Sequence, residues 1–175
     1  GGMTALGLAI DHTDRVNRLV CCGARADAPR PYAGFWHERI SVARQNGLGV
    51  LVSGTLERWF TKEFLADPQK SDSLALAHEM IMSTSVDGFC GCAAALTQLN
   101  YAPLLSRISA PALCLVGDQD QAAPPNTMRD MANAIRSGEF AVITDAAHLS
   151  NLNQPAFFNR TVGSWLFGGN LPPDS

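Results

Sequence analysis

Two residues in the second half of the chain have the chemical types and the setting of an acid and a base that act together. Asp120 closes a polar turn that follows a short apolar run, residues 112–116. His148 follows a second apolar run, residues 140–143, after a few small residues. Side chains that follow the ends of neighbouring parallel strands meet at one edge of the sheet. We therefore expect an Asp–His pair, which supplies two members of a hydrolase triad.

Each member of this pair has a simpler interpretation. Asp is common in turns because it hydrogen-bonds its own backbone, and Asp118 in the same turn is a second candidate. His148 could be a loop histidine with local partners, but Ser150 and Asn151 follow it, and both residue types cap helices. The remaining histidines have no matching acid and are expected in surface or interface roles: His12, His37 and His78.

A nucleophile for this pair is not apparent. A nucleophilic serine needs a sharp strand-to-helix turn of the form G-x-S-x-G. Thr4 is spaced one residue too widely, and Ser53 and Ser164 lack the flanking strand and the second glycine. The chain opens with Gly-Gly-Met, which is typical of the residues just after such a turn. We expect the nucleophile to precede Gly1 and the chain alone to be inactive.

The pattern of apolar residues predicts an α/β fold around these residues. Short unalternating apolar runs at 19–22, 112–116 and 140–143 indicate parallel strands covered on both faces. Residues 2–11 favour a helix, as do the residues behind two prolines at 124–125. That second helix has an apolar stripe, and a last helix is predicted from Pro155 to the glycines at 168 and 169. The apolar stripe of the helix behind the prolines at 124–125 comprises Met128, Met131, Ala132 and Ile135.

A long helical region interrupts this α/β pattern. Residues 34–98 show no strand signal, and Gly47 is a plausible helix stop. Apolar pairs at helical spacing continue the pattern. A helical insert between two βα regions predicts a lid, although the helices would also fit as one more layer of the core. We divide the chain into a core segment at 1–30, a lid at 31–100 and a core segment at 101–175. The apolar pairs at helical spacing within the lid are Leu76 with Met80 and Ala77 with Ile81.

Composition excludes several classes of protein. The 175 residues carry a formal charge of −3, and the Lys and Arg residues are scattered, so we expect no nucleic-acid partner. No apolar run reaches the roughly 18 residues that a membrane span needs. We therefore expect no membrane partner.

The five cysteines predict buried thiols in a reducing compartment, the cytoplasm. Cys21, Cys22 and Cys114 lie inside apolar runs, and an odd count does not suit a disulfide framework. Cys90 and Cys92 are separated by one residue, with no second Cys or His pair nearby. We expect no metal site there.

The chain resembles the C-terminal part of an α/β-hydrolase and is similar to 3-oxoadipate enol-lactonases. Residues 1–3 match the tail of the motif G-x-S-x-G-G-M, and likeness continues through 36–40, 56–61 and 146–155. The resemblance implies an α/β-hydrolase fold, a mostly parallel sheet with a helical lid. It also implies a Ser…Asp…His triad whose serine lies two places before Gly1, with Asp120 as the acid and His148 as the base. The implied partner is the N-terminal half of the same fold, and no metal or organic cofactor is implied.

The resemblance also implies a substrate and a reaction. The serine would attack the carbonyl of an anionic enol-lactone, a step in the catabolism of aromatic compounds by the β-ketoadipate pathway. The carboxylate of such a substrate needs a positive or hydrogen-bonding group. Candidate pocket residues are Trp36 with Arg39, one helical turn apart, and Arg58 with Trp59. The alternative is that both arginines lie on solvated helix faces and both tryptophans anchor the core.

Two other functions remain open. Lid-bearing esterases, C–C hydrolases and cofactor-free haloperoxidases share the Asp and His positions, and preference for anionic lactones over neutral esters would separate these from a lactonase. A non-catalytic interaction protein that lost the serine would fold as a stable monomer from Gly1. If the chain is instead part of a hydrolase and lacks the earlier strands, the strand near residue 20 would expose an unpaired apolar edge. The chain alone should then aggregate.

Overall fold

The computed structural model describes residues 1–168. The chain forms two compact units, which are considered separately. Unit 1 comprises Gly1–Ala26, Trp59–Thr61 and the described chain from Tyr101 onward. Unit 2 comprises Asp27–Arg58 and Lys62–Asn100. The end of the predicted core segment 101–175 and the second glycine of the predicted helix stop, at 169, lie outside the described residues.

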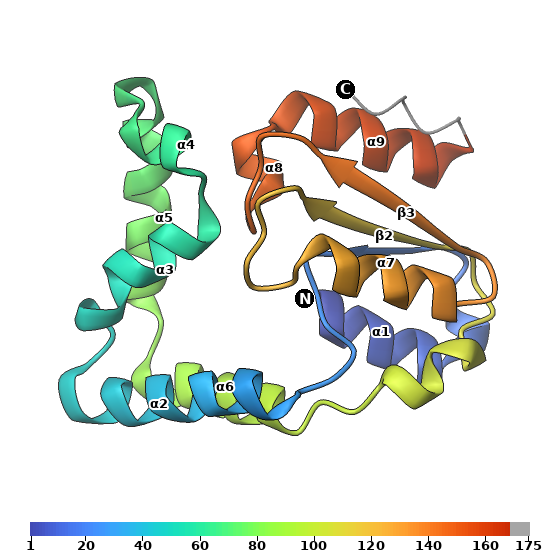
Figure 1. Cartoon of the computed structure of the whole chain (residues 1–175), viewed down its shortest axis with the longest axis horizontal. Helices are drawn as coiled ribbons and strands as arrows, with labels where there is room; N and C mark the ends of the chain where they lie inside the picture. The colour runs from blue at the N-terminus through green and yellow to red at the C-terminus, as the bar shows by residue number, and fades with distance from the viewer. Residues whose placement is uncertain (169–175) are drawn as a thin grey trace. The chain divides into compact units, whose positions relative to one another are not determined.

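Unit 1 contains a parallel sheet of three strands, β1 (Leu19–Cys22), β2 (Ala112–Gly117) and β3 (Gly138–Ile143) (Figure 1). The predicted strands are confirmed, and β3 begins two residues earlier than the apolar run at 140–143 indicated. Every residue of β2 is buried, because β2 is the central strand and both of its faces are covered. The order β1-β2-β3 brings the carboxyl ends of all three strands to one edge.

Helices cover both faces of this sheet. On one face lie α1 (Gly2–Asp11) and α7 (Pro125–Ala134), and on the other lies α9 (Pro155–Phe167), which follows the short α8 (Ser150–Asn153) (Figure 1). Both α7 and α9 begin at a proline, whose missing N–H would have no partner in the first turn in any case. Two 3-10 helices complete the unit, Thr13–Arg15 and Ala102–Arg107.

Three of the four residues predicted to form the apolar stripe lie in α7. Met128, Met131 and Ala132 are buried, and α7 packs against β2 and β3. Ile135 is also buried, but it lies just past the helix in an extended conformation rather than inside it. A second buried cluster, which includes Leu113 from the opposite face of β2, packs against α9. The core therefore has two layers, one on each side of the sheet.

Unit 2 is helical. Its helices are α2 (Arg30–Asn46), α3 (Val52–Trp59), α4 (Lys62–Ala66), α5 (Ser71–Ser83) and α6 (Val86–Thr97). Short 3-10 helices at Gly49–Leu51 and Pro68–Lys70 connect them. The prediction of an uninterrupted helical region is confirmed, and α2 packs against α6. The lid role of these helices stays a prediction.

The apolar pairs of α5 differ in their burial. Ala77 and Ile81 are buried, whereas Leu76 and Met80 are half-exposed. Only one of the two predicted stripes thus packs within the unit. At the end of α2, Gly47 has a φ of +76°, which confirms it as the helix stop.

No single helix within residues 1–168 is long and apolar enough to cross a membrane. The bent pair Pro68–Ser83 and Val86–Thr97 meets the requirement in length and composition only.

Candidate catalytic site

The carboxylate of Asp120 is held firmly in the turn after β2. Its Oδ1 accepts hydrogen bonds from the backbone N–H groups of Ala122 and Ala123, at 2.7 and 3.0 Å. Its side chain is fully buried. Two backbone donors on one oxygen restrict the rotation of the side chain. The other oxygen, Oδ2, is therefore aimed in one direction.

The structure brings His148 to that second oxygen. Nδ1 of His148 lies 2.9 Å from Oδ2 of Asp120, and the imidazole is 28% exposed. In the tautomer that donates from Nδ1 to the carboxylate, a neutral imidazole would carry its lone pair on Nε2. The predicted proximity of Asp120 and His148 is thus found. Their catalytic roles stay predictions.

Asp118, the other candidate for the acid in this turn, makes a different contact. It is exposed, and its Oδ1 accepts a hydrogen bond from the N–H of Ala146 at 3.1 Å. This contact joins the turn after β2 to the loop after β3. A β-carbon on Gly117 would lie 2.2 Å from the carbonyl oxygen of Ala146. The two loops can therefore approach this closely only because residue 117 is glycine.

The backbone on both sides of His148 is anchored. The N–H of Ala147 donates to Oδ1 of Asn153, and the N–H of Leu149 donates to the carbonyl oxygen of Trp59, each at 3.0 Å. The expectation that Ser150 caps the following helix is wrong. Ser150 is the first residue of α8, and Leu149 precedes it without a side-chain cap. Instead, Oδ1 of Asn153, the last residue of α8, accepts the hydrogen bond from the N–H of Ala147, which precedes the helix.

Gly23 is a site residue that the sequence analysis did not identify. It follows β1 and has a φ of +48°. A β-carbon there would lie 3.0 Å from Oδ2 of Asp120 and 3.2 Å from Nδ1 of His148. The carboxyl ends of all three strands thus meet at the acid–imidazole pair. A glycine directly after an apolar strand was the only signal available in the sequence.

The predicted pocket residues of unit 2 gather around aromatic rings. The guanidinium of Arg39 lies 5.9 Å from the ring centre of Trp36 and 5.3 Å from that of Phe35. The guanidinium of Arg58 lies 4.3 Å from the same Phe35 ring. Sequence reasoning missed Phe35 and also Phe89, whose ring lies 5.9 Å from Arg39. We call these five residues the arginine–aromatic cluster.

Two polar atoms of this cluster are buried without a hydrogen-bond partner, Nε of Arg39 and Nε1 of Trp36. Arg39 does donate through a terminal nitrogen to the hydroxyl of Thr55. Burial, and secondarily the positive charge of Arg58, lowers the pKa of Arg39 below its ordinary value. A partly desolvated cation beside a second cation is poorly compensated, so the cluster favours an anion.

Trp59, the last of the predicted pocket residues, belongs to unit 1 rather than to this cluster. Its backbone carbonyl accepts a hydrogen bond from the residue after His148, as described above.

Within residues 1–168, no group of three or more His, Cys, Asp or Glu side chains is arranged to hold a metal ion. Thr4, whose spacing did not suit a nucleophile, lies inside α1 and is exposed.

The comparisons with known proteins agree with this geometry. The family model described as alpha/beta hydrolase fold matches residues 1–155. The chain belongs to the α/β-hydrolase family. It is 32% identical over 166 residues to "3-oxoadipate enol-lactonase 2" of Acinetobacter baylyi, covering 93% of this chain and 59% of that protein.

Solved structures of other α/β-hydrolases have the same fold as this chain. The enol-lactonase of Burkholderia xenovorans LB400 superposes with a TM-score of 0.89 at 30% identity, covering 95% of this chain and 62% of that one. A thermophilic esterase of Thermogutta terrifontis, solved with malate bound, gives 0.86 at 27% identity, with 95% and 61% covered. This α/β-hydrolase chain therefore spans about 60% of the length of the relatives it matches.

Proposed function

We propose that Asp120 and His148 are the acid and the base of a Ser-His-Asp triad in a lactone hydrolase. The observation that carries the proposal is the 2.9 Å contact between Nδ1 of His148 and Oδ2 of a buried, doubly anchored Asp120 carboxylate. The serine would come from the segment before Gly1, two residues upstream.

The proposed reaction is acyl transfer. Nε2 of His148 accepts the serine proton as the serine oxygen attacks the lactone carbonyl, and Asp120 stabilises the imidazolium that forms. The ring C–O bond breaks, His148 returns the proton to the leaving enol oxygen, and an acyl-enzyme results. Water that loses a proton to His148 then releases the acid and regenerates the serine. The enol product becomes the ketone by tautomerisation, and no metal or organic cofactor is needed.

The proposed substrate is 3-oxoadipate enol-lactone. Two relatives that carry the lactonase name support this, since they match at 30 and 32% identity. The arginine–aromatic cluster supports it independently. The contacts of Arg39 and Arg58 within residues 1–168 are with aromatic rings and, for Arg39, a hydroxyl, and none is an ion pair. Such a cluster suits a substrate that carries a free carboxylate.

The proposed location is the cytoplasm. All five cysteines are free thiols, and Cys21, Cys90 and Cys114 are buried. Free thiols persist in a reducing compartment. Cytosolic catabolism of an aromatic-derived lactone would be consistent with this.

The proposal is tested on the whole protein, with the residues that precede Gly1 included. We expect hydrolysis of the anionic enol-lactone to exceed that of a neutral p-nitrophenyl ester in kcat/KM. His148→Ala should lower kcat by at least about three orders of magnitude. The control is His37→Ala, which removes an exposed imidazole in α2. Equal turnover in the His148 variant and the control would remove His148 from the reaction.

A general esterase is the second candidate. The likeness to the esterase of Thermogutta terrifontis favours it, at 27% identity and a TM-score of 0.86. The acid and base roles would be the same. Higher kcat/KM on neutral esters than on the anionic lactone would select this function and would leave the arginine–aromatic cluster without a catalytic use.

A further inference from the structure

The hydroxyl of Thr55 lies against the guanidinium of Arg39 in unit 2. Thr55 belongs to α3 and is 8% exposed, and Arg39 belongs to α2. Nη2 of Arg39 donates to Oγ1 of Thr55 at 2.5 Å. The hydroxyl in turn donates to the carbonyl oxygen of Leu51, four residues earlier, at 2.6 Å. Because its one proton is directed to Leu51, the hydroxyl of Thr55 accepts from Arg39.

This contact fixes the guanidinium of Arg39 in one orientation. The ring centres of Phe35, Trp36 and Phe89 lie 5.3 to 5.9 Å from its Cζ atom. Its Nε is buried without a hydrogen-bond partner. Within residues 1–168, the other terminal nitrogen, Nη1, makes no hydrogen bond and is not buried in this way. Because the guanidinium is planar and rigid, the bond to Thr55 sets the direction in which Nη1 meets a ligand.

The acceptor that holds Arg39 is neutral. A carboxylate in place of the hydroxyl would bind the guanidinium more strongly, because such a hydrogen bond is charge-assisted. It would also neutralise the cation and compete with an arriving anion. A threonine hydroxyl restricts the side chain and leaves its charge available. The guanidinium of Arg58 lies near the same Phe35 ring, so a second positive charge adds to the first.

We propose that Thr55 determines the preference of the arginine–aromatic cluster for anionic ligands by aiming Arg39 at a carboxylate of the ligand. This inference rests on the proposed role of the cluster in binding a substrate carboxylate. Thr55 is a positioning residue, since it acts through Arg39. Its loss should weaken the binding of small carboxylates and raise KM for the anionic lactone. Neither kcat nor the hydrolysis of a neutral ester should change much.

The first test measures the binding of adipate, a six-carbon dicarboxylate, to the whole protein by isothermal titration calorimetry. Thr55→Val keeps the shape of the side chain without the hydrogen-bond acceptor, and we expect it to raise the Kd of adipate about fivefold or more. Thr55→Ser keeps the hydroxyl and should restore the natural Kd. The proposal would be overturned by a natural Kd in Thr55→Val, by a Kd in Thr55→Ser as high as in Thr55→Val, or by a natural protein that binds no adipate.

Thr55→Asp separates holding the guanidinium from neutralising it. This variant keeps an acceptor for Arg39 but adds a negative charge, so we expect the Kd of adipate to rise about tenfold or more. Adipate binding as tight as in the natural protein would contradict the importance of a neutral acceptor. The comparison of Thr55→Asp with Thr55→Ser also decides the question if Thr55→Val does not fold. Ser53→Ala is the matched control, because this exposed hydroxyl of the same helix contacts Glu57 and not Arg39.

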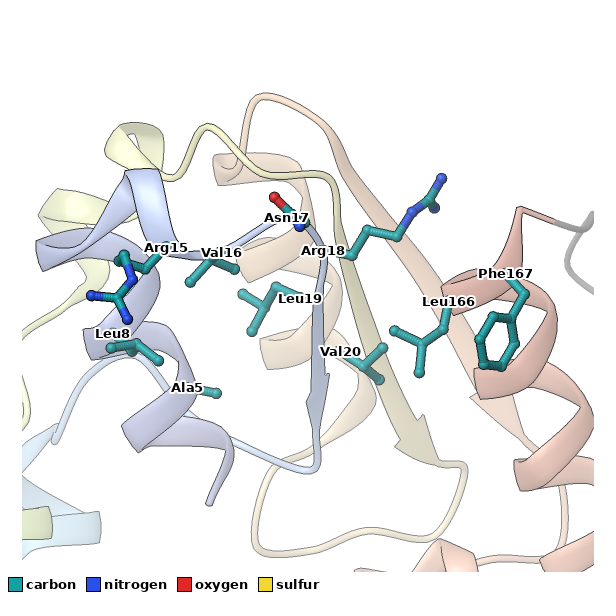
Figure 2. A pocket seen from close by; sticks show the side chains of 10 residues that line it. All are labelled: Ala5, Leu8, Arg15, Val16, Asn17, Arg18, Leu19, Val20, Leu166 and Phe167. Atoms are coloured by element: carbon teal, nitrogen blue, oxygen red, sulfur yellow. The ribbon is translucent and has the colours of Figure 1, made fainter.

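A change in overall charge needs a control of its own. Arg15 and Arg18 are exposed and line an apolar groove of about 630 Å³ beside β1 in unit 1, and no residue of the arginine–aromatic cluster lines that groove (Figure 2). Arg15→Gln lowers the net charge by one, as Thr55→Asp does, but should leave the Kd of adipate unchanged, because distant exposed charges are screened by salt. An equal rise of Kd in the two variants would show that net charge alone sets the affinity and would overturn the proposal.

Turnover distinguishes this inference from the proposed activity. With the anionic lactone, Thr55→Val should raise KM about fivefold or more and leave kcat nearly unchanged. If the natural protein hydrolyses the lactone and Thr55→Val alters neither KM nor the Kd of adipate, the role of Thr55 is wrong and the lactonase proposal stands. If the natural protein does not hydrolyse the lactone but the Thr55 variants bind adipate as expected, the lactonase proposal is wrong and the role of Thr55 stands.

Discussion

Gly23 and Asp120 meet at the carboxyl ends of β1 and β2, where a β-carbon on the glycine would lie 3.0 Å from the carboxylate oxygen Oδ2. That same oxygen contacts Nδ1 of His148. Real β-carbons rarely approach a neighbour this closely, so the glycine sets the space in which the acid and the imidazole meet.

Gly23→Ala should therefore damage the site as well as the fold. An alanine at a φ of +48° costs about 1–2 kcal/mol of stability. Its methyl group would also displace Asp120 or His148, so we expect kcat to fall at temperatures where the variant is fully folded. Gly168→Ala is the matched control, because its φ is +81° and a β-carbon there would meet nothing within 4 Å. Full turnover by folded Gly23→Ala would show that the contact is unimportant.

Asp120→Asn should lower kcat by about four orders of magnitude with little loss of stability. The amide nitrogen can take the place of Oδ2 and donate to Nδ1, which would leave the proton on Nε2, where the serine proton must go. Asp118→Asn, in the same turn, keeps the acceptor for the N–H of Ala146 and should retain activity. Steady-state kinetics of the two variants would decide the matter. Similar losses in both would point to the turn rather than to the acid.

Arg39→Gln should raise KM for the anionic lactone by about tenfold or more and leave kcat nearly unchanged, since it removes a charged hydrogen-bond donor. Hydrolysis of a neutral ester should change little. Arg44→Gln provides the control, because Arg44 is an exposed residue of the same helix. The proposed substrate contact would be contradicted by equal KM changes for the two substrates.

Buried thiols should make the protein less stable in alkali. Burial raises the pKa of Cys22 to about 11 and, with the nearby charge of Cys22 as a second cause, that of Cys114 to about 12, from an ordinary 9.0. The folded pKa is the higher one, so this stability is present below about pH 9 and is lost as pH rises toward 11 and 12. Tm measured from pH 8 to 11 should fall more steeply in the natural protein than in Cys22→Ala. The exposed Cys92, replaced by Ala, should leave the slope unchanged.

Local sequence pattern predicted most of the helices and strands. The runs at 19–22 and 112–116 are strands because short, continuous apolar segments suit a sheet buried on both faces. The prolines at 124 and 155 marked helix starts because the φ of proline is fixed, and the glycine at 47 marked a helix end because glycine readily adopts a positive φ. Ser150 shows the limit of such rules, because its residue type favours a cap while the loop around His148 places Leu149 there.

The sequence by itself determined which polar residues follow the buried parallel strands. Residues in that position emerge at one edge of a sheet. It therefore indicated Asp120 and His148 as partners before any distance was known. Only the tertiary structure decided which atoms meet, that Gly23 after β1 borders the site, and that the rings of Phe35 and Phe89 lie near Arg39. These contacts join segments far apart in the chain, and no local pattern encodes the space between two loops.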